Sequence, residues 1–166
     1  MTASKEVVIS NVHGLHTRPV MKFVDMASQF ASEIKVHKGG AEPADAGALP
    51  RDAIDEVVAA IIKREQNGST GFGKGVAVPH VKHPKVKKMA GTVGRSETGI
   101  DFAALDHQPV YSVVLLLSPD NQPQQHLQAM NIIFSSLQKD MFRRFLRQST
   151  TRQAIQELLE EADQGK

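Results

Sequence analysis

A near-continuous apolar run in the second half of the chain, Tyr111–Leu117, constrains the fold more than any other feature. Such a run is typical of a central strand that is buried on both faces. The polar and turn-forming residues 118–121 are expected to end this strand. Helices are predicted on either side of it along the chain, over 49–66 and 124–137, because each of these segments carries one apolar face. The sequence therefore predicts an α/β fold with a sheet flanked by helices.

A glycine-rich stretch, Gly68–Gly75, leads into a second short apolar strand, Val76–Val78. It holds four glycines in eight residues, so the backbone there must bend sharply or approach another group closely. Pro79 fixes φ and lacks an N–H donor, and the strand is therefore expected to stop there. His80 would then project from a rigid strand end beside flexible loop backbone, which is a good place for a reactive imidazole.

The other expected elements are short. A strand is predicted over 90–95, a turn at Thr98-Gly99, and a loop over 102–109. Thr150 and Gln153 have the spacing of a capping box for a last helix. Further strands are predicted over 7–9 and 34–36, and further helices over 18–31 and 140–146.

Composition limits the classes of function. The 166 residues include no cysteine, which excludes disulfides and thiolate metal sites. The net charge of +2 is too small for a general nucleic-acid binder. No long apolar run resembles a signal peptide or a membrane span, so a cytoplasmic protein without membrane insertion is expected.

The charge is nevertheless uneven. Residues 66–96 contain no Asp or Glu, and this basic neighbourhood of His80 suits an anionic group or an acidic partner surface. A solvated basic face is the simpler interpretation. The basic residues are Lys74, Lys82, Lys85, Lys87, Lys88 and Arg95.

The segment Gly14-Leu15-His16-Thr17-Arg18-Pro19, followed by an amphipathic helix, resembles the active centre of HPr, the histidine phosphocarrier of the bacterial phosphotransferase system. The resemblance implies that His16 carries a phosphoryl group on Nδ1 and that Arg18 helps to hold it. A helix N-terminus is also a suitable anion site. A helix-capping turn with an incidental histidine is the alternative.

The resemblance to HPr stops near Gly40. It covers residues 1–40, about half of that domain, and residues 41–47 read as a linker. A β-α-β unit of this size buries too little surface to stand alone. We expect its strand and helix to dock on the rest of the chain, and we expect enzyme I to phosphorylate His16 poorly.

The longer resemblance is to enzyme IIA of the fructose/mannitol class, which includes the nitrogen-related enzyme IIA. It covers about residues 46–166 and implies a mixed β-sheet flanked by helices. The domain, 48–166, would lack the first strand and helix of the family, and Val81 stands where many members have glycine. The segments that carry the resemblance are Arg64–Gly71, Gly75–His80, Gly99–Phe102, Pro109-Val110 and Gln125–Leu127.

This second resemblance implies the functional residues. His80 would receive the phosphoryl group from HPr, His126 would be the second histidine of the site, and Arg64 would lie beside them. An imidazole with a pKa near ~6.5 suits a phosphoryl relay, which depends on positioning and charge stabilisation and requires no metal or other cofactor. The phosphate-binding loop would consist of Gly68, Ser69, Thr70 and Gly71.

Other kinds of site are less well supported. The pairs His13/His16 and His80/His83 have a metal-ligand spacing, but no third ligand accompanies either pair. The glycine-rich stretch lacks the Lys-Ser/Thr ending and the following helix of a P-loop. The histidines expected at the surface are His37, His83 and His107.

Together these features predict a histidine phosphocarrier that accepts a phosphoryl group on His80 and passes it on or signals by it. HPr, enzyme I or both would be donors, and a IIB component or a regulatory target would be the recipient. Because no IIB or IIC domain follows, the nitrogen-related regulatory type is favoured. A non-catalytic interaction module and an inactive fusion of half an HPr with a truncated IIA remain as alternatives.

Overall fold

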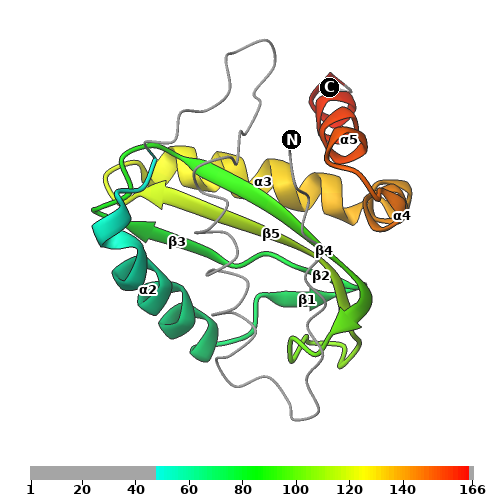
Figure 1. Cartoon of the computed structure of the whole chain (residues 1–166), viewed down its shortest axis with the longest axis horizontal. Coiled ribbons are helices and arrows are strands. Elements are labelled where there is room, and N and C mark those ends of the chain that lie inside the picture. Colours follow the sequence, from blue (N-terminus) through cyan, green and yellow to red (C-terminus); the bar gives the residue numbers. More distant parts are fainter. Residues whose placement is uncertain (1–47, 165–166) are drawn as a thin grey trace, which may run out of the picture.

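The computed structural model describes residues 48–164. The expected HPr-like segment 1–40, its docking, and the linker 41–47 lie outside the described residues. From residue 48 onward the chain forms a mixed sheet with helices on both faces (Figure 1). This confirms the α/β fold with a mixed sheet that the sequence predicts.

Strand β5 (Val110–Pro119) is the centre of the sheet. Strand β4 (Ala90–Ile100) pairs with it antiparallel along almost its whole length, from Val110 to Leu117. Strands β2 (Val76–Ala77) and β3 (His80–His83) both pair with β5 in parallel. Because a strand has two edges and β4 occupies one, β2 and β3 follow each other along the other edge. The hairpin partner of β2, β1 (Gly71–Gly73), completes the sheet.

One face of the sheet is covered by α2 (Ile54–Gln66), which follows the short 3-10 helix η1 (Arg51–Ala53). The buried side of α2 packs on Ala77 and on alternate residues of β5, Val113 and Leu115. Successive side chains of a strand point to opposite faces, and this alternation assigns these residues to the α2 side. The α2 residues in this core are Val57, Val58 and Ile61.

The opposite face is covered by α3 (Pro123–Gln138), followed by α4 (Asp140–Gln148) and α5 (Arg152–Gln164) (Figure 1). Val76, Val78 and Leu116 supply the sheet side of this second core. The sheet is therefore the middle layer between two apolar cores. The helical residues buried in the second core are Met130, Leu137, Phe142 and Leu146.

The cap of the last helix lies one residue later in the chain than the sequence predicts. The hydroxyl of Thr151, not Thr150, accepts the N–H of Ala154, at 3.2 Å. Because Ala154 has no side-chain acceptor, the reciprocal half of a capping box is missing. The expected pairing of Thr150 with Gln153 was therefore wrong.

Three strand boundaries also differ from expectation. Residues 98 and 99 lie inside β4 and form no turn, although the pairing with β5 shifts between Arg95 and Ile100. Ser118 and Pro119, expected to end the central strand, belong to it. Pro79 does interrupt the strand before it, but the chain resumes as β3 immediately afterwards, so His80 opens a strand.

Candidate functional site

His80 stands at the break between β2 and β3. Around the break the backbone stays anchored, because the N–H of Val78 donates to Thr70 O at 3.0 Å and Pro79 O accepts the N–H of Leu116 at 3.0 Å. The Val78 carbonyl accepts a hydrogen bond from Nδ1 of the His80 ring, at 2.7 Å. A carbonyl oxygen can only accept, so Nδ1 must carry the proton. In the neutral ring, Nε2 therefore holds the lone pair.

His126 lies beside it. It sits in the first turn of α3, it is buried with 7% of its surface exposed, and its ring centroid is 5.7 Å from that of His80. Its Nδ1 is 2.8 Å from Oγ of the buried Ser118. Burial lowers the pKa of His126, and the nearby His80 and Lys82 lower it further. The His126 ring is therefore neutral near pH 7.

Strand alternation explains why these groups meet. Val76, Val78 and His80 follow one another at every second position on the edge beside β5, and the first two pack in the core under α3. Leu116 of β5 packs in the same core, so Ser118, two residues on, points to the same face. The face that α3 covers therefore receives His80 from one strand, Ser118 from its neighbour and His126 from the helix.

Arg64 and the glycine-rich loop belong to the end of α2, on the face of the sheet opposite to His126. Arg64 is in the last turn of α2, and its Nη1 donates to Gly68 O at 3.0 Å. The adjacent Glu65 accepts both the N–H and the hydroxyl of Thr70, each at 2.6 Å. Because Thr70 O is bonded to Val78, this loop connects the end of α2 to the backbone next to His80.

In the expected phosphate-binding loop, residues 68–71, several hydrogen-bond donors are already paired with other groups of the protein. The Gly68 N–H donates to Glu65 O at 3.1 Å, and the Gly71 N–H donates to the hydroxyl of Ser69 at 3.1 Å. Thr70 gives both of its donors to the Glu65 carboxylate. In this arrangement the loop is held in place by its own hydrogen bonds.

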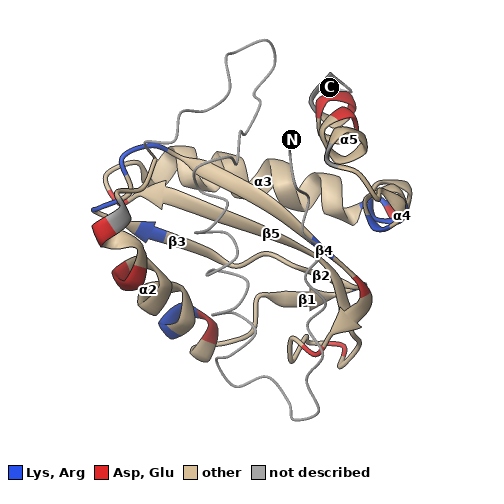
Figure 2. Ribbon diagram, in the orientation of Figure 1, with Lys and Arg blue, Asp and Glu red and all other residues tan. Residues whose placement is uncertain are grey.

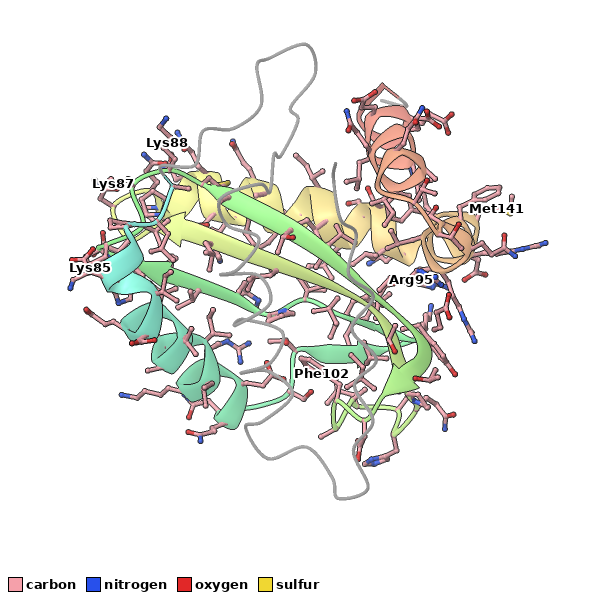
Figure 3. The ribbon with its side chains drawn as sticks, viewed as in Figure 1. Lys85, Lys87, Lys88, Arg95, Phe102 and Met141 are labelled. Atoms are coloured by element: carbon pink, nitrogen blue, oxygen red, sulfur yellow. The ribbon has the colours of Figure 1, made fainter. Side chains whose placement is uncertain are left out.

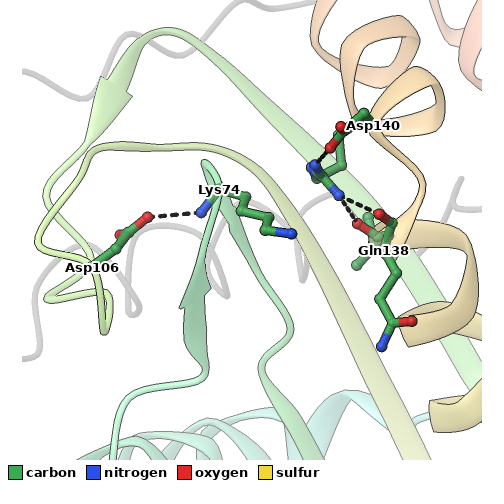
Figure 4. A network of polar contacts seen from close by, with 6 residues as sticks. Lys74, Asp106, Gln138 and Asp140 are labelled. Carbon is green, nitrogen blue, oxygen red and sulfur yellow. Dashed lines mark hydrogen bonds and ion pairs between the residues drawn. The ribbon is translucent and has the colours of Figure 1, made fainter.

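The loop over residues 101–109 packs against the glycine-rich stretch. The Ser69 hydroxyl donates to Phe102 O at 3.1 Å, and Gly71 O accepts the N–H of Leu105 at 2.8 Å. The Lys74 N–H donates to the Asp106 carboxylate at 2.8 Å (Figure 4). These hydrogen bonds hold the glycine-rich stretch against the loop over residues 101–109.

Three lysines that follow the end of β3 form a basic tip of the molecule. Lys85, Lys87 and Lys88 gather at this end of the sheet (Figure 3), whereas the charges of α5 at the far side are acidic (Figure 2). His83 is buried, although the sequence predicts a surface residue. Its Nδ1 accepts the N–H of Lys85 at 3.2 Å, and its Nε2 lies 3.4 Å from Glu56 of α2.

The structure also bears on the histidine pairs that have the spacing of metal ligands. Within residues 48–164, no group of three His, Cys, Asp or Glu side chains is arranged to hold a metal ion. Both ring nitrogens of His83 are engaged in the contacts just described. His13, His16 and Arg18 lie outside the described residues. In the described part of the chain, no helix is long and apolar enough to cross a membrane.

Two residues of the site were missed in the sequence. Ser118 was assigned to a strand break, yet it follows Leu116 at the strand period, and a polar residue at such an inward position was the available signal. Glu65 was read only as part of a motif. A carboxylate at the end of a helix, where cations are usual, was the signal for its role in holding Thr70.

Comparison with known proteins identifies the family. The profile of the phosphoenolpyruvate-dependent sugar phosphotransferase system, EIIA 2, matches residues 27–162, and the profile of the PTS HPr component phosphorylation site matches residues 3–49. The two matches overlap over residues 27–49.

Curated relatives include a nitrogen regulatory protein of Bradyrhizobium diazoefficiens, 40% identical over 60% of this chain and 65% of that protein. The fructose-specific EIIA component of Haloferax volcanii is 33% identical over 70% of this chain and 75% of its own length. In the fructose-specific EIIABC component of Bacillus subtilis, which is 33% identical over 63% of this chain, the match spans 16% of the relative. The chain thus spans less than two thirds of the Bradyrhizobium and Bacillus proteins.

Solved structures have the same fold. The nitrogen regulatory protein IIA-Ntr from Neisseria meningitidis superposes with a TM-score of 0.68 at 24% identity, over 89% of this chain and 88% of that one. The mannitol enzyme IIA from Escherichia coli, solved in complex with phosphorylated enzyme IIB, superposes with a TM-score of 0.64 at 16% identity, over 93% of both chains. On the extent of the profile match and the identity to the Haloferax protein, this chain belongs to the EIIA 2 family of the phosphoenolpyruvate-dependent sugar phosphotransferase system.

Proposed function

We propose that this chain is a histidine phosphocarrier that takes a phosphoryl group on Nε2 of His80. The observation that carries the proposal is the hydrogen bond from Nδ1 of His80 to the Val78 carbonyl, with the His126 ring 5.7 Å away. The bond holds the ring in one tautomer and leaves the Nε2 lone pair for a nucleophilic attack. It also fixes the ring against a strand that is part of the core.

The transfer balances without a cofactor. The Nε2 lone pair of His80 attacks the phosphorus atom of a donor phosphohistidine, and the P–N bond to the donor breaks. The donor imidazole, protonated on its other ring nitrogen, leaves with that electron pair as a neutral ring. His80 becomes a phosphoimidazolium that keeps its proton on Nδ1, against the Val78 carbonyl. Passing the group on is the reverse step, in which a recipient nucleophile attacks and His80 becomes the leaving group.

The neighbours of His80 supply charge stabilisation. The oxygens of a phosphoryl group in transfer are stabilised by donors and positive charges placed in advance. The His126 ring lies 5.7 Å from that of His80, and Lys82 shares the face of β3 with His80. Arg64 acts at the Gly68 end of the loop, where its guanidinium keeps the loop beside Val78 and leaves further N–H groups for a phosphoryl oxygen. Gly68, Ser69, Thr70 and Gly71 hold the loop geometry.

The proposed partners are HPr, itself charged by enzyme I, as donor, and a IIB component or a regulatory target as recipient. The names of the Bradyrhizobium and Neisseria proteins favour the nitrogen-related regulatory type, in which the phosphorylation state of His80 would be read by other proteins. The exposed Lys82 of β3 and Lys87 of the basic tip suit an acidic surface on such a partner, whereas Lys85 is already paired with Glu56 at 2.8 Å.

The N-terminal segment is proposed to be an incomplete HPr-like unit, residues 1–40, joined through the linker 41–47 to a IIA-like domain over 48–166. The match of the HPr phosphorylation-site profile to residues 3–49 supports an HPr-like N-terminal segment, although it runs through the proposed linker. Its candidate phosphoryl site consists of His16 and Arg18.

Intact-protein mass spectrometry tests the acceptor. Incubation with phosphoenolpyruvate, enzyme I and HPr is expected to add one phosphoryl group rapidly to the wild-type chain, and this rapid labelling is expected to be absent from the His80→Ala variant. His107→Asn is the matched control, because this exposed histidine has a φ of 54°, which asparagine tolerates. Undiminished labelling of His80→Ala would rule out His80 as the acceptor. A wild-type chain that takes no label would favour the non-catalytic module.

A further inference from the structure

Ser118 is a fully buried polar residue at the end of the central strand, with 0% of its surface exposed. Its hydroxyl oxygen lies 2.8 Å from Nδ1 of His126. Lys82 faces it across the parallel pair of β3 and β5. A buried hydroxyl at this position needs a partner, because an unpaired buried hydroxyl is costly.

The direction of this hydrogen bond follows from what each group can do. The serine has one O–H that must donate when buried, and Nδ1 of His126 is the acceptor that lies within reach. Burial lowers the pKa of His126, and the nearness of His80 and Lys82 lowers it further, which favours the neutral ring. A neutral imidazole whose Nδ1 accepts carries its proton on Nε2.

We propose that Ser118 is a positioning residue that fixes neutral His126 with its proton on Nε2, so that Nε2–H is the donor presented to a phosphoryl oxygen. This inference rests on the proposed function of His80. The two histidines would then hold opposite tautomers, each set by one hydrogen bond on Nδ1. Val78 O accepts from His80, whereas Ser118 Oγ donates to His126.

The two histidines need different tautomers because they have different roles. His80 must expose a lone pair to form a bond to phosphorus, and His126 must expose an N–H to stabilise negative oxygen. If His126 carried its proton on Nδ1, its lone pair would face the phosphoryl oxygens and repel them. Ser118 thereby distinguishes a donor from a second nucleophile.

Nitrogen-15 NMR of the unphosphorylated, histidine-labelled chain tests the assignment. At about pH 8, well above the ordinary histidine pKa of about 6.5, two-bond couplings report which ring nitrogen is protonated. We expect the Nε2–H form for His126 in the wild type and a mixture of both forms in Ser118→Ala. Ser112→Ala is the matched control, because Ser112 is equally buried in the same strand but pairs with β2 and β4, away from His126.

Phosphoryl transfer from HPr supplies the functional readout. Ser118→Ala is expected to slow labelling of His80 by about ten- to a hundred-fold, as the loss of a group that orients a working histidine does elsewhere. Ser112→Ala should keep the wild-type rate, and Ser118→Thr, which restores a hydroxyl, should recover part of the loss.

A wild-type His126 with its proton on Nδ1, or a Ser118→Ala variant with an unchanged tautomer, would overturn the inference. A Ser118→Ala variant that transfers at the wild-type rate would overturn it as well. Because the NMR measurement needs no transfer, failure of the proposed function would show separately, as a wild-type chain that takes no label.

Discussion

The charge state of His126 depends on its surroundings more than on the residue itself. Burial is the largest cause of its lowered pKa, followed by the nearness of His80 and Lys82. A histidine that must stay neutral in the folded chain but can take up a proton when unfolded couples stability to pH. This coupling can be measured without any partner protein.

We expect the free energy of unfolding to fall as the pH drops below about 6.5, the ordinary histidine value, and to keep falling through the lower folded pKa of His126. The sign follows because the unfolded chain binds more protons than the folded chain in that window. Urea unfolding at a series of pH values should show a shallower decline in His126→Asn, whose amide oxygen can still accept from Ser118. Parallel pH profiles for the two proteins would contradict this account.

At the residue scale, sequence reasoning named His80, His126 and Arg64 as candidates but overlooked Ser118 and Glu65, which hydrogen-bond to His126 and Thr70. A motif names the residues that carry chemistry, whereas Ser118 and Glu65 act through hydrogen bonds that depend on where two strands and a helix end meet. His83 was misplaced for the same reason. Its burial comes from contact with Glu56 of α2, which no local pattern reveals.

At the scale of elements, the glycine-rich stretch and the loop over 101–109 work as one unit. A Cβ added at Gly71 would lie 2.9 Å from Ala104 Cβ and 3.0 Å from Ala104 Cα. One of these is a backbone atom, so the contact cannot be relieved by a side-chain rotation. The glycine is therefore required for close approach of the two loops.

Gly71→Ala is expected to destabilise the fold by about 1–3 kcal/mol, the usual cost of overpacking, and to slow phosphorylation of His80 by displacing the loop next to Val78. Gly91→Ala is the control, because a Cβ there would have an ordinary contact with Leu115 O at 3.4 Å. Chemical denaturation should place Gly91→Ala at or above the wild type. Equal stabilities of the two variants would show that the loops are not packed as described.

The elements themselves were largely predictable where the apolar pattern was strong. The central strand, α2 and the helices of the second layer follow from it, since each buries an apolar face. The errors fall at short segments. Strand β3 is four residues long and follows a proline, and Gly99, with a φ of 84°, sits at a shift in strand pairing and not at a turn.

At the scale of the whole molecule, two family profiles share residues 27–49. The helix predicted over 18–31 therefore lies partly within the EIIA match. A chain that carries an HPr-type phosphorylation motif and a IIA domain raises the question of internal transfer. The linker from Gly39 to Leu49 could span at most about 35 Å, so reach alone does not forbid transfer from His16 to His80.

We expect little internal transfer, because the HPr-like unit is proposed to be incomplete. Given enzyme I and phosphoenolpyruvate without HPr, the wild-type chain should be labelled slowly and only at His16, so that His80 should stay unlabelled in both the wild type and His16→Ala. Addition of HPr should restore rapid labelling of both. Efficient labelling without HPr that disappears in His16→Ala would demonstrate a working relay inside the chain.

The interruption at Pro79 leaves the Val78 carbonyl to the imidazole of its neighbour. We expect Nδ1 of His80, which is hydrogen-bonded to that oxygen, to keep its proton throughout the transfer, so that no proton has to leave or reach this ring while phosphorus changes partners. Exchange of the solvent for heavy water should therefore leave the single-turnover rate of phosphoryl transfer nearly unchanged. A large solvent isotope effect would show that a proton is transferred in the rate-limiting step. In this view, a gap of two residues in a strand lets the protein move a phosphoryl group without moving hydrogen.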